Sequence, residues 1–256
     1  MRIHNQKMDL LVGSLVLRPY VFLFLVAFLV AGARDLGIRR TLLFGGIVWP
    51  VAWIAEFAST RVGIPFGLYH YTGHTRGQEL FIADVPFFDS LSFTFLAYAA
   101  LCVSRRVVAG RHASSGTTAL LAGFLMMMLD VVIDPLAVRG DRWFLGRIFY
   151  YPDGGAYFGV PLSNFAGWWL VGSVAIAAYL ACGGLTGARA VHRPETGIAL
   201  YYGVLGFNLA LTGWIGEWRV LATGLALHAV MACALGMIAR RTPAPGVLGT
   251  EGMQGA

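Results

Sequence analysis

The sequence predicts an all-α protein, a polytopic transmembrane bundle of about seven helices. Hydrophobic residues make up 57% of the 256 residues and charged residues only 12%, whereas a typical soluble domain carries about 25% charged residues. Too few charges remain to cover a surface that faces water, so we expect lipid to be the solvent. Apolar runs long enough to cross a hydrocarbon core, which takes about 20 residues, also recur along the chain.

Seven such runs predict the spanning helices in order. The first follows Arg2 and Lys7 and resembles a signal peptide, but its apolar core is too long for one, so we expect it to span. We expect a single transmembrane helical domain over residues 1–241 and a disordered tail, rich in Gly and Pro, over residues 242–256. The runs are Leu15–Ala33, Thr41–Ala58, Val85–Val103, Thr117–Val138, Val160–Cys182, Gly197–Ile215 and Val220–Ile238.

Acidic side chains gather toward one face of the membrane. Of the 13 Asp and Glu residues, all but Asp35, Glu195 and Glu251 map to the face that holds the N-terminus and the loops after the second, fourth and sixth runs. The net charge of +6 comes mainly from arginines dispersed among short loops, so we do not expect nucleic acid as a partner. The three cysteines stand apart without a CxxC pair, which argues against a disulfide framework and a cysteine metal site.

Ionisable residues inside the runs are the first functional signal, because each costs about 2.5 to 3.5 kcal/mol to insert and marks a functional site by default. Glu56 lies in the second run, and spacings of four and three place it on one helical face with Trp49 and Trp53. The structural alternative is a carboxylate that reaches headgroup water or pairs with Arg61.

Asp130 and Asp134, four residues apart in the fourth run, predict a pair of carboxyl groups on one helical face. Pro135 predicts that the helix ends at Asp134. Two like charges near lipid, at the negative end of a helix dipole, disfavour each other's ionisation, so we expect at least one to stay protonated near neutral pH. The alternatives are a divalent metal site or neutralisation by an arginine of the following loop, namely Arg139, Arg142 or Arg147.

Two loops on the acidic face combine turn residues with aromatics. The stretch Gly63–His74 predicts an ordered re-entrant or interfacial loop, and we expect its two histidines to be interfacial rather than metal ligands. Pro161 suits the first turn of a helix, which would place Asn164 and Trp168 on one face just inside the membrane. A buried Asn needs partners, which a water molecule or a facing carboxylate would supply. A helix cap with an aromatic belt is the structural alternative.

These stretches, in their order over residues 50–170, resemble the integral-membrane carotenoid hydratase family. The family usually continues after Val-Pro with apolar residues, a second proline and a tryptophan. This chain has Phe87–Phe93 there, so no role carries over to Asp89, and Trp143 stands alone where Trp-x-Trp is typical. The matching stretches are Glu56 with Gly63-x-x-x-Gly67-x-Tyr69-x-Tyr71, then Val85-Pro86, then Asp130-x-x-x-Asp134-Pro135, and finally Tyr157-x-Gly159-Val160-Pro161-x-x-Asn164-Phe165-x-Gly167-Trp168.

The resemblance implies a hydro-lyase that adds water to the terminal isopropylidene double bond of an acyclic or monocyclic carotenoid, giving a tertiary alcohol. It implies a lycopene-like or γ-carotene-like substrate, the lipid bilayer of a prokaryotic cell (inner) membrane, and neither a cofactor nor a metal. As a hypothesis, Asp130 or Asp134 donates the proton and Glu56 is the partner base. The residues expected to bind the substrate are Tyr69, Tyr71, Tyr157, Asn164, Phe165 and Trp168.

Two other functions fit parts of the pattern. A membrane prenyltransferase acting on carotenoid or quinone precursors would use Asp130 and Asp134 as magnesium ligands for a diphosphate, although Asp84 and Asp89 make a poor second acidic motif. A proton-coupled transporter or a receptor-like heptahelical protein would use the same carboxyl groups as a proton relay.

Overall fold

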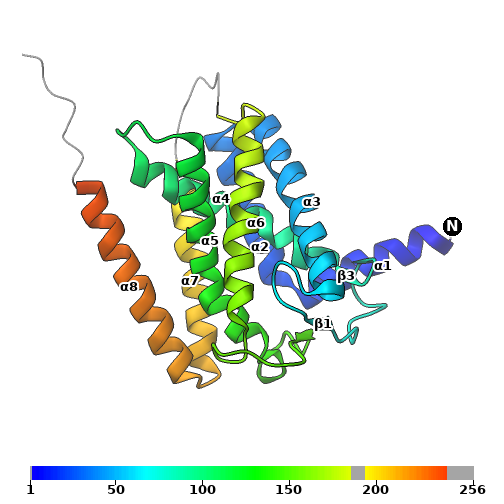
Figure 1. Ribbon diagram of the computed structural model, residues 1–256. Coiled ribbons are helices and arrows are strands. Elements are labelled where there is room, and N and C mark those ends of the chain that lie inside the picture. The colour runs from blue at the N-terminus through cyan, green and yellow to red at the C-terminus, as the bar shows by residue number, and fades with distance from the viewer. Residues whose placement is uncertain (1, 186–193, 241–256) are drawn as a thin grey trace, which may run out of the picture.

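The protein, described here by a computed structural model over residues 2–185 and 194–240, forms one bundle of helices (Figure 1). The all-α prediction is confirmed, and the tail expected at residues 242–256 lies outside the described residues. The elements in chain order are α1 (Arg2–Leu17), α2 (Pro19–Asp35), α3 (Ile38–Val62), β1 (His70–Tyr71), β2 (Phe81–Ile82), β3 (Val85–Pro86), α4 (Phe87–Val108), α5 (Ser115–Ala137), η1 (Gly140–Arg142), β4 (Phe149–Tyr150), α6 (Leu162–Ala181), α7 (Glu195–Trp214) and α8 (Trp218–Arg240).

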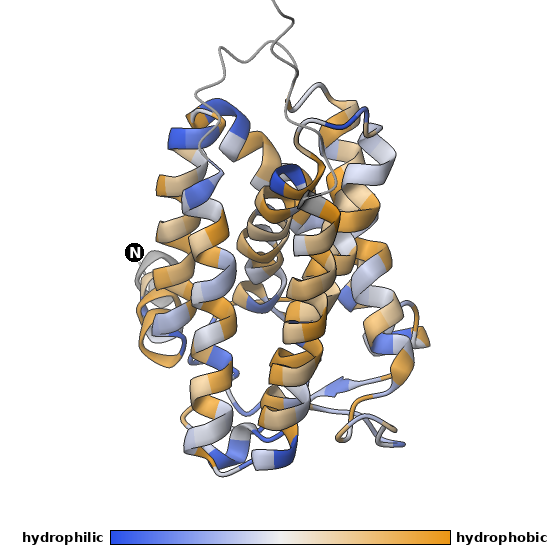
Figure 2. Ribbon diagram, turned by 90° about the vertical axis from the view of Figure 1, so that its left-hand side faces the viewer, coloured by the Kyte–Doolittle hydropathy of each residue, from blue (hydrophilic) through white to orange (hydrophobic). Residues whose placement is uncertain are grey.

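Each predicted run is helical over most of its length, and five helices of the described chain are long and apolar enough to cross a membrane alone: α3, α4, α5, α6 and α8. The bent pair α1 and α2 makes a sixth if it is counted as one span. Helix α7 is as long as α6 and packs against α4 and α8 within the bundle, but it is not apolar enough to be counted with these helices. Hydrophobic colour follows the helices, and hydrophilic residues gather at their ends and in the loops (Figure 2).

The prediction of one continuous helix over the first span, Leu15–Ala33, is wrong. The helix is interrupted at Arg18, and the axes of α1 and α2 differ by 96°. Pro19 stands in the first turn of α2, where its missing N–H costs nothing because no intrahelical acceptor precedes it. The break turns the Arg18 side chain into the protein, where it forms ion pairs with Glu79 and Asp89.

The prediction that the helix of the fourth run ends at Asp134 is also wrong, because α5 continues past Pro135 to Ala137. Proline removes one hydrogen bond but lies in the last turn, where the helix needs few more. The free carbonyl groups of that turn find other donors. Arg139 Nη1 donates to the Pro135 carbonyl oxygen at 2.7 Å, and the Val138 backbone N–H donates to that of Asp134 at 2.9 Å.

Helix α4 is the centre of the bundle. It packs against α2, α3, α5 and α7, and every residue from Phe93 to Ser104 is buried. The outer faces of the surrounding helices instead expose large apolar side chains, which is the pattern expected where lipid covers the protein. Examples of these exposed side chains are Leu23, Val26, Ile54, Leu170, Val174 and Val230.

Short antiparallel strand pairs tie the loops together at one end of the bundle. Strand β1 pairs with β4, so that Tyr71 lies opposite Phe149, and this pair joins the loop after α3 to the loop after α5 (Figure 1). Strand β2 pairs with β3 immediately before α4 begins. The loop after α3 is therefore ordered, and it covers the end of the bundle.

Glycines bring α5 and α6 into close contact. A Cβ atom added to Gly123 would lie 2.6 Å from both the Trp169 carbonyl oxygen and the Ser173 backbone nitrogen. A Cβ atom added to Gly172 would lie 3.1 Å from the Gly123 Cα atom. Such small residues let helix backbones approach closely in a membrane.

We expect Gly123→Ala to destabilise the protein by about 1 to 3 kcal/mol, because the added methyl group meets backbone atoms that cannot turn away. That loss corresponds to a melting temperature lower by roughly 2 to 10 °C, measured in detergent by circular dichroism. The matched control is Gly45→Ala, where nothing lies within 4 Å of the added carbon. A Gly123→Ala protein as stable as the control would contradict this account of the α5–α6 contact.

Candidate functional site

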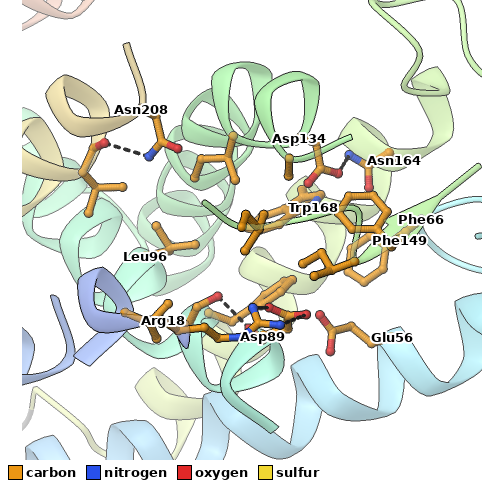
Figure 3. A pocket seen from close by; sticks show the side chains of 18 of the residues that line it. Arg18, Glu56, Phe66, Asp89, Leu96, Asp134, Phe149, Asn164, Trp168 and Asn208 are labelled. Atoms are coloured by element: carbon orange, nitrogen blue, oxygen red, sulfur yellow. Dashed lines mark hydrogen bonds and ion pairs between the residues drawn. The ribbon is translucent and has the colours of Figure 1, made fainter. Parts of the chain in front are cut away.

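A cavity of about 130 Å³ lies where the loops after α3 and α5 cover the bundle (Figure 3). An apolar cavity of about 150 Å³ holds a benzene molecule, so this one suits a small apolar group. Carboxyl groups from three different helices line it: Glu56 from α3, Asp89 from α4 and Asp134 from α5. The rest of the wall is mainly aromatic and aliphatic.

Asn164 joins the two predicted aspartates. Its Nδ2 atom donates to Asp130 Oδ2 at 2.6 Å and to Asp134 Oδ2 at 2.8 Å, and the Tyr151 hydroxyl donates to Asp134 Oδ2 at 3.3 Å. The spacing of four therefore does place both carboxyl groups on one face, toward α6. Asp130 is 0% exposed, and its Oδ1 has no hydrogen-bond partner within the described part of the chain.

The arginines that were the alternative partners of this pair bind elsewhere. Arg139 Nε lies 3.3 Å from Glu217 Oε1, and Arg142 forms an ion pair with the same carboxylate. The Arg147 guanidinium lies 5.5 Å from the centre of the Tyr150 ring. Within residues 2–185 and 194–240, no ion pair reaches either aspartate of α5.

Glu56 is 5% exposed and lines the cavity. Arg61, its alternative partner, instead places Nη2 3.4 Å from Asp84 Oδ2 at the surface. The Glu56 Oε2 atom has no hydrogen-bond partner among the described residues. A buried polar atom without a partner costs free energy and usually marks the place of a water or ligand.

A buried charge cluster beside Glu56 was not predicted from the sequence. Arg18, 2% exposed, donates from Nε to Glu79 Oε2 at 2.6 Å and from Nη2 to Glu79 Oε1 at 3.0 Å. Its Nη1 binds Asp89 Oδ1, and both Arg18 and Asp89 line the cavity. The available signal was Arg18 itself, an ionisable residue before a proline inside an apolar run.

Aromatic rings form most of the remaining wall. Trp168 is stacked on Phe93, with ring centres 4.2 Å apart and planes 16° apart, and Phe66 lies beside both. Tyr69 and Tyr71 meet edge to face, with ring centres 5.4 Å apart. The predicted residues Tyr69, Tyr71, Asn164 and Trp168 thus all line the cavity.

Two of the predicted substrate-binding residues do not line the cavity, and neither does the predicted catalytic residue Asp130. Tyr157 and Phe165 pack edge to face on each other at 5.2 Å, and neither lines the cavity. The Tyr157 hydroxyl is buried and has no partner in the described chain. Burial raises the pKa of Tyr157, and the neighbouring Asp130 carboxyl raises it further.

The buried tyrosines of the loops have raised pKa values. Burial raises the pKa of Tyr69 and of Tyr71 well above 10, and the neighbouring Glu56 carboxyl is the next largest cause for both. Burial and then Asp134 do the same for the pKa of Tyr151. These hydroxyl groups therefore remain hydrogen-bond donors at neutral and mildly alkaline pH.

We expect the ionisation of these tyrosines to leave the melting temperature unchanged up to about pH 9 and to lower it above about pH 10. The unfolded chain loses its tyrosine protons near pH 10, whereas the folded protein keeps them to a higher pH, so their contribution to stability is lost as pH rises. A Tyr69→Phe, Tyr71→Phe double variant should fall less steeply. If the wild type shows phenolate absorbance below pH 10 that this double variant lacks, then Tyr69 or Tyr71 ionises too early, and the assignment is contradicted.

Comparison with known proteins places this chain in a family. A family model described as carotenoid biosynthesis protein matches residues 16–238. The chain is also similar to bisanhydrobacterioruberin hydratase from Haloarcula japonica, with 33% identity over 174 residues, which is 66% of this chain and 56% of that protein. The chain thus spans little more than half the length of that relative, and no solved structure matches it. By the extent of the family match, the chain belongs to the carotenoid biosynthesis protein family.

Proposed function

We propose that this protein is a carotenoid hydratase, which adds water to the terminal isopropylidene double bond of an acyclic or monocyclic carotenoid. The observation that carries the proposal is the set of three carboxyl groups, from three helices, around one apolar and aromatic cavity. The similar protein from Haloarcula japonica is named as a hydratase, which supports the same reaction.

The reaction needs an acid and then a base. A carboxylic acid transfers its proton to the less substituted alkene carbon, and the π electrons form the new C–H bond. The tertiary carbon becomes a cation, the oxygen of a water molecule bonds to it, and a base takes one proton from that water. The product is a tertiary alcohol, and passing the proton back to the acid restores the site.

The two sides of the cavity supply these roles. Asp134 reaches the cavity and is the proton donor, while Asp130, hydrogen-bonded to the same Asn164 amide, positions it. Glu56, which has one oxygen without a hydrogen-bond partner among residues 2–185 and 194–240, is the base on the other side. Two carboxyl groups in different surroundings are the usual means by which proteins separate an acid from a base.

Aromatic rings stabilise the intermediate cation. Ring faces attract a cation by about 0.5 to 2 kcal/mol each, and Tyr69, Tyr71 and Trp168 all line the cavity. The rest of the polyene needs an apolar path. Phe24 of α2 and Val204 of α7 line the cavity as well and add to its apolar wall.

Replacing the acid or the base should abolish hydration without unfolding the protein. In a lycopene-producing host, Asp134→Asn and Glu56→Gln should each lower the yield of the product one water heavier than its substrate by about 10²- to 10⁴-fold. Mass spectrometry of the extracted pigments measures this. Asp84→Asn is the matched control, since Asp84 lies at the surface with a side chain that is 63% exposed. Full hydration by both site variants would rule out this assignment.

Purified protein in detergent should hydrate a lycopene-like substrate in the presence of a strong chelator. We expect the rate to change less than twofold, because the proposed steps use only carboxyl groups and water. Hydration that is lost to the chelator and restored by Mg²⁺ would contradict these steps. Absence of hydration together with Mg²⁺-dependent consumption of a prenyl diphosphate would favour the prenyltransferase. The same assay has no membrane gradient, so turnover in it would also argue against a proton-coupled transporter.

A further inference from the structure

We propose that Asp89 is a further catalytic residue of this site, which together with Glu56 holds the water that captures the cation. The inference rests on the proposed hydration and adds a residue that the family resemblance left without a role. Asp89 lies in the first turn of α4 and lines the cavity, and its side chain is 18% exposed.

Asp89 and Glu56 lie on the same side of the cavity. Figure 3 shows both beside Arg18, across the cavity from Asp134 and Asn164. The unpartnered Glu56 Oε2 atom is buried there. A water molecule between Asp89 and Glu56 would satisfy that atom and would face an alkene held in the middle of the cavity.

The charge balance of the cluster indicates that Asp89 is not needed merely to neutralise Arg18. Glu79, 1% exposed, already binds the guanidinium with both of its oxygens. Asp89 is therefore a second carboxyl group on one cation. A buried pair needs one carboxylate for each guanidinium, so the additional one is available for another use.

Arg18 also fixes the position of Asp89. Its Nη1 binds Asp89 Oδ1, whereas Asp89 Oδ2 lies 3.4 Å from Nη2. Charge-assisted bonds to a planar guanidinium hold a carboxylate in a defined orientation. A carboxylate accepts about four hydrogen bonds, so Asp89 can bind Arg18 and still accept one from water.

In this arrangement the proton and the oxygen reach the double bond from different sides. Asp134 gives its proton to one alkene carbon, and the water held by Asp89 and Glu56 bonds to the other. One proton of that water passes to this pair of carboxylates. Transfer of that proton through water to Asp134 completes the cycle, so that the net change is the addition of one water molecule to the alkene.

Deuterium exchange separates the two halves of the reaction. We expect Asp89→Asn, assayed in D₂O, to hydrate at least about 100-fold more slowly than the wild type. The cation should still form and should return to the alkene by losing a proton, so recovered substrate should gain deuterium at the less substituted carbon of its terminal double bond. Asp134→Asn should show neither hydration nor exchange, and the surface control Asp84→Asn should behave as the wild type.

Several results would overturn the role of Asp89. One is an Asp89→Asn protein that hydrates at the wild-type rate, and another is one that melts normally but loses exchange together with hydration. If Asp89→Asn melts at a lower temperature, Asp89→Glu serves instead: it keeps the carboxylate and should hydrate faster than Asp89→Asn, and an equal rate would overturn the proposal. A wild-type protein that forms no hydrated product would instead refute the proposed function itself.

Discussion

Carboxyl groups inside an apolar bundle must be paired, protonated or bound to a ligand, because an isolated buried charge costs too much free energy. The carboxyl groups around the cavity of this protein have three different surroundings. Arg18 binds Glu79, and Asn164 bridges the two aspartates of α5, while Glu56 retains an oxygen without a partner in the described chain. The paired groups hold the wall in place, and the unpartnered oxygen is where chemistry is possible.

Local spacing made much of the fold and part of the site predictable. Apolar runs gave the helices, and the spacing of Asp130 and Asp134 put both within reach of Asn164. Phe165 shows the limit of a linear motif. Each residue of a helix turns about 100° from the previous one, so Trp168 shares the face of Asn164, and Phe165 points to Tyr157 instead.

The Arg18 cluster could not be predicted in the same way. Arg18 and Asp89 are 71 positions apart, and no periodicity records which loop a buried arginine will meet. The break before Pro19 was detectable as a proline after a charged residue. Hydropathy averaged over a window does not reveal it, because the apolar residues on both sides outweigh one arginine. Relations between distant segments therefore decided which carboxyl groups gather at the cavity.

The cavity lies beneath the loops, and α2 and α7 contribute apolar side chains to its wall. For the proposed reaction, this geometry admits a long polyene by its tip and leaves the remainder among lipid tails. The new alcohol would then form near the headgroups, where a hydroxyl is readily hydrated. A molecule bearing two reactive tips would have to leave, reverse its direction in the bilayer and enter again, so that a singly hydrated intermediate is released between the two turnovers.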